Sequence, residues 1–103
     1  MPGGLQENVV ENIKHVFVRY PQIEKVILYG SRAKGNFDPG SDIDLTIIGN
    51  DIELSMLNRI ENDLDDLLLP YKFDLSVLRN ITNENLLDHI QRVGIEFYIR
   101  SIK

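Results

Sequence analysis

Two aspartates with one residue between them are the first candidates for chemistry. Asp42 and Asp44 open an apolar segment that continues to Ile48. Side chains two residues apart on a β-strand point the same way, so the two carboxylates are expected side by side on one face. A proton or a cation between them would relieve their mutual repulsion. For the pair alone, two solvated acids at a strand end would be the favoured interpretation, so a functional one needs support from other residues.

A glycine–serine turn precedes the two acids and could hold a phosphate group. Gly30 has no side chain and would let a ligand approach the backbone closely. Ser31 begins a predicted helical turn over residues 31–34, where free N–H groups favour an anion. Arg32 and Lys34 add positive charge beside this turn, although single basic side chains are more often simply solvated. These residue types predict a phosphate-binding turn.

A third acid comes from a later segment. Residues 71–78 alternate between apolar and polar side chains, which predicts a strand with Asp74 on its polar face. If that face also carries Asp42 and Asp44, the three carboxylates suit a hard cation such as Mg²⁺, which also binds phosphate oxygens. With two such ions the site could transfer a phosphoryl or nucleotidyl group. If the face is only exposed to water, Asp74 is a solvated acid.

Two other motif interpretations fail on spacing. Gly30 and Gly35 are spaced like the glycines of a P-loop, but Asn36 occupies the position of the essential lysine. An EF-hand loop beginning at Asp42 would need glycine at its sixth position, where Ile47 lies within an apolar strand.

The combined pattern resembles a known family. The segment GSRAKG at residues 30–35, the segment SDIDL at residues 41–45 and the later Asp74 are similar to the motifs of the minimal nucleotidyltransferases, within the DNA polymerase beta-like superfamily. The resemblance covers residues 26–78 by motif, and nearly the whole chain by length and element order. It implies nucleotide phosphates, from ATP or another NTP, at Gly30, Ser31, Arg32 and Lys34. It implies two Mg²⁺ ions at three catalytic acids, Asp42, Asp44 and Asp74, with Asp74 also helping to deprotonate the acceptor hydroxyl.

The resemblance also implies a partner protein. Small members of this family pair with HEPN-domain proteins that resemble ribonuclease toxins, and some act as antitoxins by transferring AMP from ATP to a tyrosine hydroxyl of the toxin. Two alternatives stay open. The chain could be a non-catalytic nucleotide-binding module that neutralises a partner by binding. It could also modify a small-molecule hydroxyl, with the acceptor site on a second chain of a homo- or hetero-oligomer.

Composition sets wider limits. At 103 residues, 43% hydrophobic and 26% charged, residues 1–103 are expected to form a single globular domain. There is no cysteine, which fits a reducing cytoplasm. The net charge of -5 makes nucleic acid an unlikely direct partner. Neither a signal peptide nor a membrane-spanning segment is expected.

Hydrophobic periodicity predicts the elements that must position these residues. The expected fold class is mixed α/β (α+β), with helices covering a small sheet, as in polymerase beta-like nucleotidyltransferases. How the strands pair is left open, and residues 1–4 are expected outside regular structure. Helix 51–69 is expected to begin with Asp51 as its N-cap and to bury a leucine-rich stripe from Leu54 to Leu68. His15 is expected at the surface and His89 in a structural role. Helices are predicted at residues 5–20, 51–69 and 84–93, and strands at residues 24–29, 42–48, 71–78 and 95–100.

Overall fold

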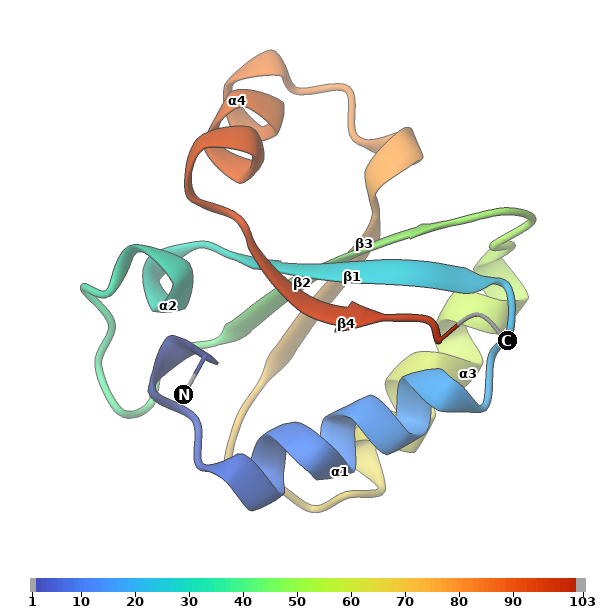
Figure 1. Cartoon of the computed structure of the whole chain (residues 1–103), viewed down its shortest axis with the longest axis horizontal. Coiled ribbons are helices and arrows are strands. Elements are labelled where there is room, and N and C mark those ends of the chain that lie inside the picture. Colours follow the sequence, from blue (N-terminus) through green and yellow to red (C-terminus); the bar gives the residue numbers. More distant parts are fainter. Residues whose placement is uncertain (1, 102–103) are drawn as a thin grey trace.

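The computed structural model describes residues 2–101, which form a sheet with helices on both faces (Figure 1). This confirms the predicted mixed α/β class. No helix in this range is long and apolar enough to cross a membrane. The elements, in chain order, are η1 (Pro2–Gly4), α1 (Glu7–Val18), β1 (Ile23–Tyr29), α2 (Ser31–Lys34), β2 (Ile43–Gly49), α3 (Leu54–Asp65), β3 (Phe73–Val77), η2 (Leu78–Asn80), α4 (Glu84–Val93) and β4 (Ile95–Ile99).

The sheet has the strand order β3-β2-β1-β4. β1 lies antiparallel to both β2 and β4, and β2 lies parallel to β3. A parallel pair needs a long crossover connection, and the segment containing α3 provides it. The strand pairing that the sequence left open therefore places β2, which contains Asp44, in the middle of the sheet.

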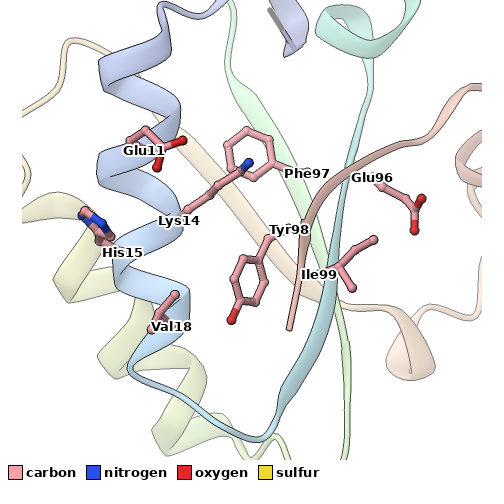
Figure 2. A pocket seen from close by; sticks show the side chains of 8 residues that line it. All are labelled: Glu11, Lys14, His15, Val18, Glu96, Phe97, Tyr98 and Ile99. Carbon is pink, nitrogen blue, oxygen red and sulfur yellow. The ribbon is translucent and has the colours of Figure 1, made fainter. Parts of the chain in front are cut away.

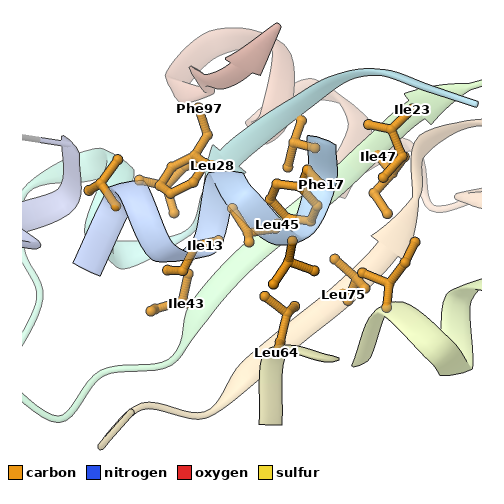
Figure 3. Close-up of a cluster of buried hydrophobic side chains, with 14 of the residues drawn as sticks. Ile13, Phe17, Ile23, Leu28, Ile43, Leu45, Ile47, Leu64, Leu75 and Phe97 are labelled. Carbon is orange, nitrogen blue, oxygen red and sulfur yellow. The ribbon is translucent and has the colours of Figure 1, made fainter. Parts of the chain in front are cut away.

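α1 and α3 cover one face of the sheet, and α4 lies on the other (Figure 1). Alternation along β2 sends Ile43, Leu45 and Ile47 into the core between the sheet and α1 and α3 (Figure 3). Phe17 of α1 is fully buried there and meets Phe97 edge to face, with ring centroids 6.5 Å apart. The intervening residues of β2, Asp44 and Thr46, consequently point to the face that carries α4.

α3 differs from the predicted helix. It runs from Leu54 to Asp65 rather than over residues 51–69. Asp51 adopts a left-handed backbone with φ of 57°, so it is not the N-cap. Leu54 and Leu68 are 72% and 89% exposed. Leu68 lies beyond the end of the helix, where the helical period no longer applies. Leu54 is inside it, but the buried face of α3 runs through Met56, Ile60 and Leu64, and a residue two positions before Met56 points away from that face.

The first residues also differ from expectation. Residues 2–4 form the short helix η1, and the Gly3 carbonyl accepts a hydrogen bond of 2.9 Å from Nη1 of Arg32. Leu5 directly after them is fully buried. The expectation that residues 1–4 lie outside regular structure is therefore wrong for residues 2–4, and residue 1 lies outside the described residues.

Candidate functional site

The strand register brings two of the predicted acids together. Asp44 of β2 is the Cα partner of Asp74 on the parallel strand β3, and of Tyr29 on the antiparallel strand β1. In both parallel and antiparallel pairs, directly opposed residues project from the same face. Tyr29, Asp44 and Asp74 therefore form one row across three strands, on the α4 face of the sheet.

Asp44 is the most strongly perturbed acid in this row. Its pKa is raised from 3.8 to about 6, chiefly by partial burial and in addition by the nearby carboxylates of Asp74 and Asp42. Burial disfavours the ionised form, and each like charge adds to that cost. Perturbed carboxyl groups of this kind are typical of sites that bind a cation or exchange a proton.

Asp42 lies just before β2, although the sequence predicted that this strand begins at residue 42. β2 begins at Ile43, so Asp42 precedes the strand and its side chain is exposed. Among residues 2–101 no group of three or more His, Cys, Asp and Glu side chains is arranged to hold one metal ion. Asp42 lies outside the strand ladder that aligns Asp44 with Asp74, and the three-acid metal site stays a prediction.

The donor chemistry nevertheless suits a divalent cation. Asp42, Asp44 and Asp74 offer only carboxylate oxygens, which are the ligands that Mg²⁺ prefers. Their mutual effect on the pKa of Asp44 shows that positive charge beside them would be stabilising.

Polar residues follow the acids along the same face of the sheet, two positions further along β2 and β3. The hydroxyl of Ser76 donates to Oγ1 of Thr46 over 3.0 Å, and Thr46 is fully buried. Burial raises the pKa of the Tyr29 hydroxyl, a hydrogen bond with Ser76 opposes this, and the charges of Asp74 and Asp44 reinforce it. Tyr29 consequently stays protonated and neutral beside the carboxylates.

Gly30 packs directly against this row. Its φ is +76°, and a Cβ placed on it would run into the carboxylate of Asp44. The sequence predicted that glycine was needed so that a ligand could approach closely. In the structure the group that approaches is Asp44 itself, so Gly30 is required both for its backbone conformation and for the position of that acid.

Replacing Gly30 by valine is expected to impair the site far more than replacing Ser31 by alanine. Valine would place its Cβ in the Asp44 carboxylate and resist the positive φ. Ser31→Ala keeps the backbone and removes one hydroxyl. Calorimetry of nucleotide binding in Mg²⁺ should show at least tenfold weaker binding for Gly30→Val, an effect on the order of 1.4 kcal/mol, and a smaller change for Ser31→Ala. Equal, unperturbed affinities would remove this turn from the binding site.

Arg32 has a different place from the one that the sequence predicted. It is 3% exposed, and its guanidinium donates to the carbonyls of Gly3, Pro39 and Ser41 at 2.9–3.0 Å. The same group lies between the rings of Phe37 and Tyr71, at 5.0 and 4.9 Å from their centroids. Arg32 is therefore neither a phosphate ligand on the surface nor a solvated charge. It ties α2 to the loop that leads into Asp42.

Ser31 and Lys34 lie at the two ends of α2. Ser31 is partly buried and opens the helix, and Lys34 is exposed at its end. The Lys34 N–H donates to the Gly30 carbonyl over 3.1 Å, and the N–H of Gly35 donates to the Ser31 carbonyl over 2.9 Å. These bonds close the single turn that the sequence predicted, and they leave the ammonium of Lys34 at the surface.

Sequence reasoning missed His89. It was expected in a structural role beside the apolar stripe of α4, yet its Nε2 accepts the N–H of Gly30 over 3.0 Å, across 59 residues of sequence. Its ring also meets Tyr29 edge to face, with centroids 6.3 Å apart. A histidine on an amphipathic helix gives no local signal of such a contact.

A hollow of about 560 Å³ lies elsewhere, between the outer side of α1 and β4 (Figure 2). It is lined by Lys14, His15 and Val18 of α1 and by Phe97 and Tyr98 of β4, among others. His15 is exposed, as the sequence predicted. None of the acids discussed above reaches this hollow, so it is separate from the candidate site.

Comparisons with known proteins agree with this geometry. The sequence matches the family described as Polymerase beta, Nucleotidyltransferase over residues 11–103. No curated protein matches the chain significantly. The fold is similar to a chain of a toxin–antitoxin complex crystallised with AMP-PNP, with a TM-score of 0.70 and 22% identity over 93% of this chain and 75% of that one.

A second similar structure is the complex of a tri-AMPylated HEPN toxin with its MNT antitoxin from Shewanella oneidensis. The TM-score is 0.68 and the identity 18%, over 93% of this chain and 74% of that chain. At such identities these structures show a shared fold, whereas the family match covers most of the sequence. The chain therefore belongs to the polymerase beta nucleotidyltransferase family.

Proposed function

We propose that this protein transfers AMP from ATP to a hydroxyl group of a HEPN-type toxin partner and so acts as an antitoxin. The observation that carries the proposal is the register pair of Asp44 and Asp74 beside the Gly30 turn. Family membership supports nucleotidyl transfer. The similar complex that contains a tri-AMPylated HEPN toxin supports the acceptor class.

The roles of the residues follow from their positions. Asp42, Asp44 and Asp74 would hold up to two Mg²⁺ ions through carboxylate oxygens, and Gly30, Ser31 and Lys34 would position the phosphates. A bound divalent cation would neutralise phosphate charge and make the acceptor hydroxyl easier to deprotonate. Asp74 is exposed at the outer end of the carboxylate row, so it can accept the proton of an incoming hydroxyl.

Labelled ATP offers a direct test. The protein, Mg²⁺ and a HEPN-domain candidate partner are incubated with ATP labelled on the α-phosphate. We expect label on the partner and none when the partner is omitted. Tight binding of the partner without label would favour the non-catalytic binding module. Label on a small-molecule hydroxyl alone would favour a nucleotidyltransferase that acts on small molecules.

Replacing Asp74 by alanine is expected to separate binding from transfer. Asp42 and Asp44 remain to bind nucleotide with Mg²⁺, so the affinity for a non-hydrolysable ATP analogue should change little. Transfer should fall by about 100-fold or more, because no carboxylate is left at position 74 to take the proton from the hydroxyl that receives AMP. Calorimetry and the labelling assay measure the two quantities on the same preparation. Transfer at the wild-type rate would show that Asp74 is only a solvated acid.

A further inference from the structure

α4 contributes one side chain to the turn that precedes α2. Nε2 of His89 accepts the N–H of Gly30 over 3.0 Å, and the two residues are 59 positions apart in the sequence. Because Nε2 is the acceptor, the ring carries its proton on Nδ1 in this arrangement. His89 is partly buried, and its ring packs against the ring of Tyr29 at an interplanar angle of 78°.

Gly30 is thereby held on three sides. Its N–H is bound by His89, its carbonyl accepts from the N–H of Lys34 over 3.1 Å, and its Cα lies against the carboxylate of Asp44. The backbone has φ of 76° and ψ of -158°, which is open almost only to glycine. A glycine has many alternative conformations of similar energy, so an anchor from another element is needed to select this one.

We propose that His89 is a positioning residue that holds the Gly30–Ser31 turn beside Asp44 for nucleotide binding. The proposal rests on the proposed function, because it assigns His89 a part in presenting that turn to a nucleotide phosphate. Loss of the acceptor would let Gly30 leave its conformation. The nucleotide would then have to reorder the turn on binding, at a cost in affinity.

Two substitutions separate the hydrogen bond from the packing of the ring. His89→Phe keeps an aromatic ring against Tyr29 but has no acceptor. His89→Gln loses the ring but can offer an amide oxygen to the N–H of Gly30. His15→Gln, at the exposed histidine of α1, is the matched control. We expect His89→Phe to bind a non-hydrolysable ATP analogue about five- to tenfold more weakly, the effect of one hydrogen bond. His89→Gln should stay within about twofold of the wild type.

Amide hydrogen exchange at Gly30, followed by NMR without nucleotide, tests the anchor itself. The amide should be protected in the wild type, His89→Gln and His15→Gln, and should exchange faster in His89→Phe. The proposal is overturned if Gly30 is equally protected in all four proteins. It is also overturned if His89→Phe binds the analogue as tightly as, or more tightly than, the wild type, because His89 would then be neutral or would obstruct the site.

Failure of the proposed function has a different signature. In that case the wild-type protein binds no ATP analogue, while exchange at Gly30 still depends on the acceptor at position 89. Equal weakening of binding in His89→Phe and His89→Gln, with equal loss of thermal stability, would indicate a packing role for the ring and would overturn the positioning role.

Discussion

Replacing Asp44 by asparagine is expected to abolish nucleotidyl transfer and, at the same time, to make the protein more stable at neutral pH. Asp44 is the central member of the carboxylate row, with Asp74 directly opposite it and Asp42 nearby. Asparagine keeps the shape of the side chain but removes the negative charge. That charge would hold a cation, and the cation would neutralise the phosphates. Transfer should fall by about 100-fold or more, as for other losses of electrostatic stabilisation in an active site.

The gain in stability follows from the raised pKa of Asp44. The folded protein has a pKa of about 6 for this carboxyl group, against 3.8 ordinarily, so the folded state binds the proton more tightly than the unfolded state. The contribution of Asp44 to stability is therefore fully present below about pH 4 and is lost as the pH rises to about 6. Asparagine does not ionise, so the difference between variant and wild type should grow over this range and then level off.

The expected size of this gain is modest. The full shift corresponds to about 3 kcal/mol. Because Asp44 is only partly buried, screening by solvent should reduce the gain to about 1 kcal/mol. Urea unfolding at pH 4 and pH 7, without divalent ions, measures it. Adding Mg²⁺ at pH 7 should stabilise the wild type and leave the variant unchanged.

Asp51→Asn provides the matched control for Asp44. Asp51 is exposed and has a φ of 57°, which asparagine also adopts readily. This substitution should change neither transfer nor the pH dependence of stability. Wild-type transfer by Asp44→Asn, or the same stability difference at pH 4 and pH 7, would contradict the role assigned to Asp44.

The second large effect is expected from Arg32→Ala, on stability. The substitution leaves the carbonyls of Gly3, Pro39 and Ser41 without their donor and opens a gap between two aromatic rings. Hydrogen bonds from a charged group contribute about 1.5–3 kcal/mol each, and the cost of burying the guanidinium offsets part of this sum. A net loss of about 3 kcal/mol follows. For a chain of this size it should lower Tm on the order of 15 °C.

Two further variants show whether the geometry or the charge of Arg32 matters. Arg32→Lys keeps the charge, but a single ammonium on a flexible stem cannot serve three carbonyls and stack between rings, so most of the loss should remain. Arg79→Ala, at an exposed arginine of η2, should stay within about 0.5 kcal/mol of the wild type. Differential scanning calorimetry compares all of them. Full stability of Arg32→Lys would show that charge alone is sufficient.

The sequence by itself determined most of the secondary structure and singled out the acids that are proposed for the site. The apolar period predicted the bounds of α4, residues 84–93, and in the structure Asn83 caps the helix by accepting from the N–H of Leu86. Alternation along β2 and β3 identified the polar face of each strand, which carries Asp44 or Asp74. These features are local, because they depend on which side chains recur every two or every 3.6 residues.

The tertiary structure decided which residues meet. Local periodicity does not specify strand order, so the register that pairs Asp44 with Asp74 is known only from the folded sheet. Asp42 appeared equivalent to Asp44 in the sequence, but it lies outside the ladder and is exposed.

Arg32 and His89 show the same limit more sharply. Their environments come from segments far away in the sequence: Tyr71 and Gly3 around Arg32, and Gly30 beside His89. An arginine in a basic turn and a histidine on an amphipathic helix look like surface or packing residues in a one-dimensional pattern. Burial and hydrogen-bond partners depend on packing between distant elements, and only the tertiary structure specifies that packing.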